Sequence, residues 1–238
     1  MHGFESIVVL YLTIDCLLIT GQNGLSGEIP PEVSSLPLLE ALRLRDNALV
    51  GTIPALNALT SLVTLDVENN GLYGDAFIDF AGLSNLERYR VSGNNLVGTI
   101  PADLSSLESI RQIWFADNIV TGTLPDSLFG LSTLETLYFY RNEITGSLPD
   151  SITLSSLKGI QGYTNFLAGT IPEGFYDSTL LEEIRFDQNA LVGTLSESIG
   201  DLTALTDLRL SSNILGGALP ISFYALSNLG RSFFCNVE

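Results

Sequence analysis

The sequence predicts a right-handed α/β solenoid of nine stacked coils, with a parallel β-sheet on its concave face and short 3-10 or irregular segments on its convex face. Three observations predict this fold. Asparagine recurs every 23 or 24 residues, glycine follows it four positions later, and apolar residues precede it at fixed distances. A period of this length indicates a repeat architecture, in which each unit buries its apolar side by stacking on its neighbours.

The recurring asparagines define the phase of the repeat. We expect each side-chain amide to turn inward and to bond backbone groups at the bend of its coil, which gives a structural asparagine ladder. A missing member would leave buried groups unpaired at about 1 to 3 kcal/mol. The nine positions are Asn23, Asn47, Asn70, Asn94, Asn118, Asn142, Asn165, Asn189 and Asn213.

The residues around each asparagine predict the elements of a coil. Apolar residues stand eight, five and three positions before it, as Leu39, Leu42 and Leu44 do before Asn47. The last two alternate with outward-facing residues, which predicts a short strand in every coil. Glycine at plus four allows a backbone geometry closed to other residues. Proline at plus seven, where present, limits the chain as it enters the outer segment.

This pattern, LxxLxxLxLxxNxLxGxIP, resembles the plant-type leucine-rich repeat. The resemblance covers about residues 12 to 229. It implies a receptor-like ectodomain, or a secreted inhibitor similar to the polygalacturonase-inhibiting proteins, in which the concave face binds the ligand. It also implies an extracellular or cell-surface location.

The predicted domain is the nine-repeat array at residues 12–229. Residues 1–22 are expected to form a degenerate first coil or the remnant of an N-terminal cap, and residues 230–238 a truncated C-terminal end. We expect no signal peptide or transmembrane segment in this sequence, because the apolar run from Ser6 to Ile19 is too short to span a bilayer and contains Asp15.

The two cysteines, Cys16 and Cys235, fall in the first and last coils. Strands about 4.8 Å apart would separate them by several times the roughly 7 Å that a disulfide permits between Cα atoms. We therefore expect no bond between them. The resemblance implies cap cysteines that have lost their partners, and the alternative is a pair of buried thiols.

Composition and missing motifs exclude several classes of function. The net charge of -17 makes nucleic acid and anionic membranes poor partners, because both require cationic surfaces, so we expect no nucleic acid among the partners and no direct membrane insertion. The one histidine, His2, lies near the terminus, and no spacing of histidines and cysteines suits a metal. We expect a non-catalytic protein without metal or cofactor.

The residues expected to face outward from the strands differ in composition from the rest of the chain. They include seven of the nine arginines, the only tryptophan and seven carboxylates, so this face has no net charge. Aromatic and arginine enrichment is typical of binding surfaces, so we predict recognition of a protein, peptide or glycan here. The predicted ligand-binding residues are Trp114, Tyr138, Tyr140, Tyr163, Arg88, Arg90, Arg141 and Arg185.

Two alternatives stay open. In the first, the arginines only pair with acids on adjacent coils, such as Arg43 with Asp66 or Arg209 with Asp187, and the aromatic rings only cover the sheet. The second concerns a column five positions after each asparagine: Glu28, Thr52, Asp75, Thr99, Thr123, Ser147, Thr170, Thr194 and Ala218. Such a hydroxyl ladder could order water in an ice-binding or wall-associated structural protein, although threonine also suits a short second strand.

Overall fold

The computed structural model describes residues 17–19, 21–150 and 155–233. The predictions for His2, Cys16 and Cys235 lie outside these residues. The chain divides into two compact units, residues 1–120 and 121–238, and each is described by itself. None of the helices in the described ranges has the length and apolarity needed to cross a membrane.

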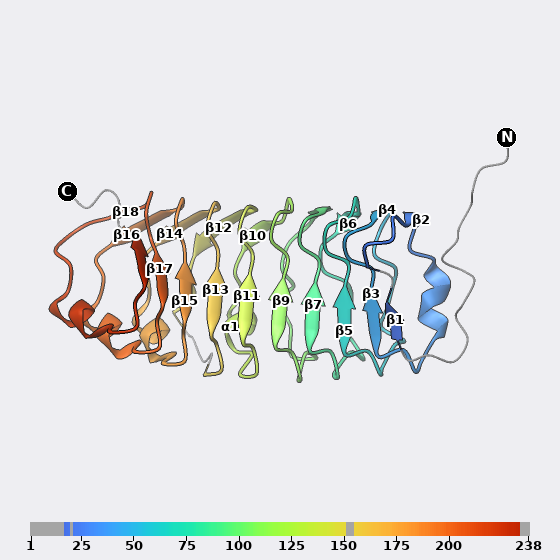
Figure 1. Cartoon of the computed structure of the whole chain (residues 1–238), viewed down its shortest axis with the longest axis horizontal. Helices are drawn as coiled ribbons and strands as arrows, with labels where there is room; N and C mark the ends of the chain where they lie inside the picture. The colour runs from blue at the N-terminus through green and yellow to red at the C-terminus, as the bar shows by residue number, and fades with distance from the viewer. Residues whose placement is uncertain (1–16, 20, 151–154, 234–238) are drawn as a thin grey trace. The chain divides into compact units, whose positions relative to one another are not determined.

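In the first unit, one short strand from each coil contributes to a parallel row (Figure 1). The residue five positions before each asparagine pairs with its counterpart in the next coil, so Leu42, Leu65, Tyr89 and Ile113 form one buried column. The strands are β1 (Leu17–Ile19), β3 (Ala41–Arg43), β5 (Thr64–Asp66), β7 (Arg88–Arg90) and β9 (Gln112–Trp114).

Shorter elements complete the coils of the first unit. Two parallel pairs of strands follow the bend after the asparagines, and one 3-10 helix begins after Pro30. The pairs are β2 (Ser26–Glu28) with β4 (Ala48–Val50) and β6 (Tyr73–Asp75) with β8 (Asn95–Val97), and the helix is η2 (Pro31–Ser35).

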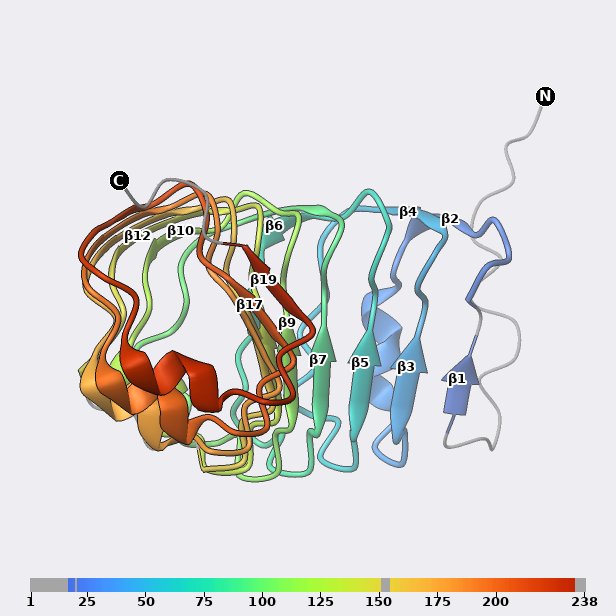
Figure 2. The same ribbon diagram turned by 60° about the vertical axis from the view of Figure 1, so that its left-hand side comes forward.

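The second unit repeats this plan with more regular flanks. Figure 2 shows its second row of strands and its helical turns on different sides of the coils. The first row is β11 (Thr136–Tyr138), β13 (Gly159–Gln161), β15 (Glu183–Arg185), β17 (Asp207–Arg209) and β19 (Arg231–Phe233). The second row is β10 (Thr121–Thr123), β12 (Glu143–Ser147), β14 (Phe166–Gly169), β16 (Ala190–Gly193) and β18 (Ile214–Leu215). The helical turns are α1 (Asp126–Phe129), η3 (Glu173–Asp177), η4 (Glu197–Asp201) and η5 (Ile221–Ala225).

Each unit is thus a stack of coils with parallel strands on one side and 3-10 or irregular segments on another, which confirms the predicted fold class. The third repeat has no proline at plus seven, and aromatic residues fill its interior instead. Phe77 meets Phe115 edge to face with ring centroids 5.1 Å apart, and Phe80 meets Tyr89 in the same way at 5.1 Å. The buried Tyr89 hydroxyl donates to the carbonyl of Ala76 at 2.6 Å.

The asparagine side chains bond backbone groups in more than one coil. The Asn70 amide nitrogen donates to the carbonyls of Leu44 at 3.0 Å and Val67 at 3.1 Å, in adjacent coils. Its oxygen accepts from the Leu49 amide at 3.0 Å. The same three-way pattern recurs at Asn94, Asn118, Asn165, Asn189 and Asn213. Every such amide therefore fixes the distance and register between neighbouring coils.

The residue before each asparagine lies at the corner where the coil bends after its strand and has an unusual backbone conformation, a feature that the sequence analysis did not anticipate. In eight described coils it is a non-glycine residue with a left-handed φ, including Thr164 at 55° and Arg141 at 51°. This conformation is unfavourable for a β-branched residue such as Thr164. The asparagine bonds that follow hold the corner in place.

Asn94 provides a test of the amide bonds. Asn94→Ala removes one acceptor and three donor contacts from a buried site, because the amide bonds the Val67, Val91 and Ser92 carbonyls and the Leu72 amide. We expect the free energy of unfolding, measured by urea denaturation, to fall by about 1 to 3 kcal/mol. The neighbouring Asn95 is exposed, so Asn95→Ala is the matched control. Equal effects of the two substitutions would contradict the structural role of the ladder.

Candidate functional site

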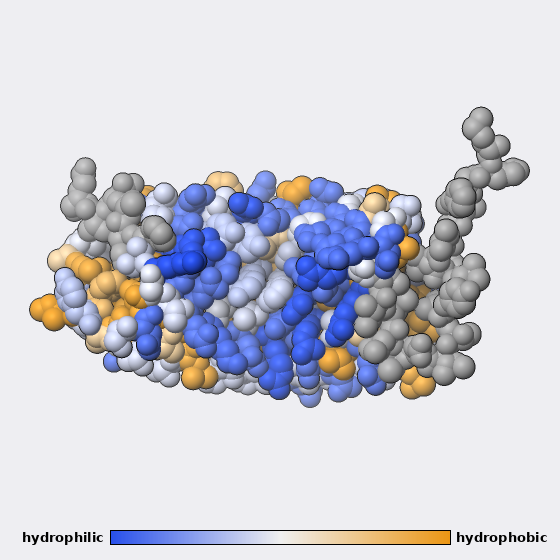
Figure 3. All heavy atoms as spheres, viewed as in Figure 1, coloured by the Kyte–Doolittle hydropathy of each residue, from blue (hydrophilic) through white to orange (hydrophobic). Residues whose placement is uncertain are grey.

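We use the term strand face for the outward-facing side chains of the first-row strands and of the residues that lead from them to the asparagine. In the space-filling view, hydrophilic residues dominate the strand face of the first unit (Figure 3). Strands β7, β9, β11, β15 and β17 alternate half-buried, buried, half-buried, as the sequence predicts. Strand β5 departs from this pattern, because Thr64 and Asp66 are buried as well as Leu65.

In the first unit, Arg90 and Trp114 form one cluster. The register of β7 and β9 pairs these two residues, and the Arg90 guanidinium carbon lies 4.1 Å from the centre of the Trp114 ring. Arg90 also donates to Gln112 Oε1 from Nε at 3.0 Å and from Nη2, and its Nη1 lies 3.7 Å from Asp66 Oδ2. Burial lowers the pKa of Arg90, and the nearby Asp66 and Glu68 oppose this effect.

Arg88, on the same strand as Arg90, has different partners. Its guanidinium lies 3.5 Å from Glu87 and donates to the Thr64 hydroxyl at 3.4 Å. The contact with Thr64 directs Arg88 toward β5, the strand before its own. The two arginines of β7 therefore do not form a single cluster.

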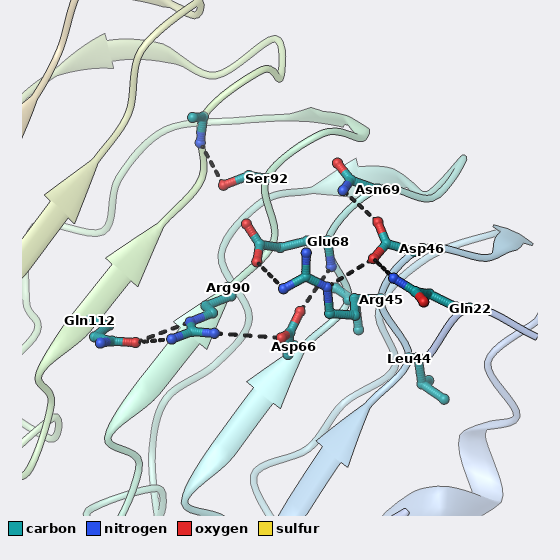
Figure 4. Close-up of polar contacts among 12 residues, drawn as sticks. Gln22, Leu44, Arg45, Asp46, Asp66, Glu68, Asn69, Arg90, Ser92 and Gln112 are labelled. Atoms are coloured by element: carbon teal, nitrogen blue, oxygen red, sulfur yellow. Dashed lines mark hydrogen bonds and ion pairs between the residues drawn. The ribbon is translucent and has the colours of Figure 1, made fainter. Parts of the chain in front are cut away.

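Two carboxylates of the third coil lie between arginines of the coils on either side (Figure 4). Glu68 is 3.9 Å from Arg45, which also donates to Asp46 at 3.0 Å. Asp66 is 3.7 Å from Arg90. Burial raises the pKa of Glu68, and the charge of Asp66 adds to this shift, while Arg45 and Arg90 oppose it.

Ion pairs other than the two suggested by the sequence, Arg43 with Asp66 and Arg209 with Asp187, form on this face, although the charge of Asp187 does act on Arg209. Arg209 pairs with Asp207 on its own strand, at 2.8 Å, and Asp66 pairs with Arg90 at 3.7 Å. A strand places residues two apart on the same face, so a long guanidinium reaches either its own strand or the next one. Pairing across coils does occur, but sequence spacing alone did not identify the partners.

In the second unit, three of the predicted residues form a stack. The rings of Tyr140 and Tyr163 lie 4.4 Å apart and are inclined by 6°, and the Arg185 guanidinium lies 4.3 Å from the centre of Tyr163. Arg141 is exposed and 5.9 Å from the same ring. Arg185 Nε is buried without a hydrogen-bond partner and lies 4.0 Å from Asp187.

Tyr138 lies outside this stack. Its hydroxyl is 3.5 Å from Glu183, which also accepts from Gln161 Nε2 at 2.8 Å. Burial, followed by the charge of Glu183, raises the pKa of Tyr138 to about 12. Gln112, Asp66 and Glu183 all belong to the outward-facing positions that the sequence identifies, but residue type alone did not show which of them would hold an aromatic or arginine side chain.

The hydroxyl column lies along the second row of strands. Thr123, Ser147, Thr170 and Thr194 are exposed. Each threonine methyl fills the space above a glycine of the next coil, where a Cβ on Gly146, Gly193 or Gly217 would lie 2.7 to 2.9 Å from it. These glycines also have left-handed φ angles. Packing therefore fixes the threonine rotamers and leaves their hydroxyls at the surface.

The described residues offer no evident metal centre. Within them, no group of three or more histidine, cysteine, aspartate or glutamate side chains could hold a metal ion. What this surface presents is stacked planar groups, fixed guanidinium groups and hydroxyls. These groups can bind a ligand through hydrogen bonds and charge.

Comparison with known proteins places the repeat among leucine-rich repeats. The family model described as Leucine Rich Repeat matches residues 133–154. A probable leucine-rich repeat receptor-like serine/threonine-protein kinase of Arabidopsis thaliana is 37% identical over 81 residues. That match covers 30% of this chain and 9% of the relative, so the chain corresponds to a small part of the kinase.

Several solved structures have a fold similar to this one over almost the whole chain. The ectodomain of the plant receptor kinase GASSHO1/SCHENGEN3 from Arabidopsis thaliana, in complex with CASPARIAN STRIP INTEGRITY FACTOR 2, has a TM-score of 0.87 and 32% identity, covering 91% of this chain and 26% of that one. The plant peptide hormone receptor RGFR1, in complex with RGF2, has a TM-score of 0.66 and 28% identity, with coverage of 90% and 42%. A plant ice-binding protein has a TM-score of 0.69 and 25% identity, with coverage of 90% and 70%.

The raised pKa of Glu68 gives a prediction about stability and pH. The folded state binds the Glu68 carboxyl proton more tightly than the unfolded chain does. The resulting contribution to the free energy of unfolding is complete below the ordinary glutamate pKa and is lost as pH rises through the raised value. Glu68→Gln should therefore increase the free energy of unfolding at neutral pH, and the gain should disappear in acid. Urea denaturation over a pH series measures this, with the exposed Glu108→Gln as control. A Glu68→Gln variant with a lower free energy of unfolding than the wild type at neutral pH would contradict this prediction.

Proposed function

Because the chain is a leucine-rich repeat protein of the plant type, we propose that its strand face binds a peptide or protein ligand without catalysing a reaction. The observation that carries this proposal is the gathering of stacked aromatic and guanidinium groups on a face of balanced charge. In the second unit these are Tyr140, Tyr163 and Arg185, and in the first unit Arg90 and Trp114. Buried aromatic and arginine anchors supply most of the energy at protein interfaces.

The stacking favours a peptide over a glycan. A sugar ring is held by the open face of an aromatic ring, but both faces of Tyr163 are covered, one by Tyr140 and the other by Arg185. One face of Trp114 is covered by Arg90. The stacked groups present edges, hydroxyls and guanidinium N–H donors, which match the carbonyl and side-chain acceptors of a peptide.

The similar proteins support this reading and suggest its setting. Two of the similar structures are plant receptors solved in complex with another molecule, and one of these is a peptide hormone receptor. We infer that this chain acts outside the cell or at its surface, as part of a receptor-like protein. A secreted enzyme inhibitor would use the same face, and its ligand would be a folded protein.

Substitutions on the strand face test the proposal. Peptides selected from a display library on the immobilised wild-type chain would be titrated by calorimetry against Tyr163→Ala, Arg185→Ala and Trp114→Ala. We expect at least one of these variants to lose about 2 kcal/mol or more of binding free energy while remaining folded, as removal of an interface anchor does.

Tyr224→Ala is the matched control, because this tyrosine is 82% exposed on η5 and lies away from the strand face. It should bind as the wild type does. Selected peptides that bind all three strand-face variants with unchanged affinity would refute the assignment. If the wild type bound a sugar on a glycan array and Tyr163→Ala lost that binding, the assigned ligand would be a sugar and not a peptide.

Ice binding is a second candidate function, and the flank formed by the second row of strands in the second unit favours it. The five strands of its second row contain a single charged residue, Glu143. On this flank the exposed hydroxyls of Thr123, Thr170 and Thr194 have fixed positions, because their methyl groups pack on glycines. A regular array of fixed hydroxyls could order water, and a plant ice-binding protein is among the similar structures.

Ice recrystallisation in the presence of purified protein distinguishes the two functions. If the flank binds ice, the wild type should keep crystals small, and Thr123→Lys with Thr170→Lys should abolish the effect. Thr203→Lys, at an exposed position off the strands, is the control. Crystals that coarsen as fast with wild-type protein as in buffer would dismiss this candidate and leave the ligand-binding proposal unaffected.

A further inference from the structure

We propose that Gln112 and Asp66 are positioning residues, which hold the Arg90 guanidinium flat on Trp114 and so fix the orientation in which this ring meets a ligand. The inference rests on the proposed function, because Arg90 and Trp114 are two of its binding residues. It assigns a task to two side chains that lie beside the predicted site and that the proposed function does not itself use.

The guanidinium is held from both of its edges (Figure 4). On one edge, Nε and Nη2 both donate to Gln112 Oε1. On the other edge, Nη1 lies 3.7 Å from Asp66 Oδ2. The guanidinium is planar and its donors point in fixed directions, so partners on two edges determine the plane of the group. That plane lies over the Trp114 ring at 4.1 Å.

The backbone supports this arrangement. Asp66, Arg90 and Trp114 occupy the same position in three successive coils, because β5 pairs Asp66 with Arg90 and β7 pairs Arg90 with Trp114. Gln112 lies on the same strand as Trp114, two residues earlier, and therefore on the same face. Its side chain reaches back to the preceding coil to accept from Arg90.

Burial makes the two supports necessary. The Arg90 side chain is 20% exposed and that of Asp66 is 4% exposed, so each charge has lost most of its water. A buried charge is costly unless it is paired and hydrogen-bonded. An arginine side chain without these partners would also lose more rotamer freedom when a ligand ordered it, and prior ordering removes that cost from binding.

Intrinsic fluorescence reports how well the Trp114 ring is covered, because Trp114 is the only tryptophan of the chain. In the full chain, without any ligand, acrylamide quenching reports how well Arg90 covers the ring. We expect Gln112→Leu and Asp66→Asn each to raise the quenching constant and to shift the emission maximum. Gln112→Glu should keep the wild-type value, because its carboxylate accepts the same two hydrogen bonds.

Gln161→Leu is the matched control. Gln161 is an outward-facing glutamine of the second unit that donates to Glu183 at 2.8 Å, and its replacement should leave the Trp114 signal unchanged. Circular dichroism and the melting temperature establish that each variant is folded. Should Gln112→Leu fail to fold, Asp66→Asn alone decides.

Two results would overturn the proposal. In the first, Arg90→Ala raises the quenching constant but Gln112→Leu and Asp66→Asn do not, which would mean that the ring alone holds the guanidinium. In the second, Arg90→Ala has no effect, which would mean that the stack is absent in solution. Neither result depends on a ligand, so both differ from a failure of the proposed function, which would appear as selected peptides that bind strand-face variants and wild type equally.

A selected peptide adds the functional measurement. If the positioning matters for recognition, Gln112→Leu should weaken binding and Gln112→Glu should restore it. Unchanged affinity with Gln112→Leu, alongside weaker binding with Trp114→Ala, would limit Gln112 to a structural role and overturn its assignment as a positioning residue.

Discussion

The bond from an asparagine amide to backbone groups of neighbouring coils is the interaction on which the rest of the structure depends. An amide supplies two donors and an acceptor within one small group, so it can satisfy a bend in its own coil and link that coil to its neighbour. At Asn94 and Asn165 this occurs in a nearly dry environment, where an unpaired backbone group would be expensive. The repeat period follows, because an added or missing residue would move the amide away from its partners.

The aligned coils explain the chemistry of the strand face. Neighbouring parallel strands lie about 4.8 Å apart, close to the separation of stacked planar groups. Tyr140 and Tyr163 occupy the same position in consecutive coils, and their rings stack at 4.4 Å. Arg90 and Trp114 do the same at 4.1 Å. Planar side chains at equivalent positions thus stack on one another, and the coil spacing gives a surface of ring edges and guanidinium groups.

The periodic features could be predicted from the sequence, and the ones that depend on individual rotamers could not. The phase of the asparagines placed the strands, and alternation identified which residues of β7 and β9 face outward. Burial of Asp66 and Glu68 was missed, because it results from arginines that fold over them from both neighbouring coils. The left-handed corner at Arg141 and Thr164 was missed as well, since neither residue type favours that conformation. For the candidate site, residue types were sufficient to nominate Tyr163 and Arg185, but not to foresee that each covers the other.

Amide hydrogen exchange, followed residue by residue by NMR, tests the central role of the asparagine bonds most directly. The Leu49, Leu72, Leu96, Leu167 and Leu191 amides each donate to an asparagine oxygen in the next coil. The account predicts that these five exchange slowly and that Asn94→Ala speeds exchange at Leu72 far more than at Leu191. Fast exchange at these amides in the wild-type chain, or an Asn94→Ala variant in which Leu72 stays protected, would contradict it.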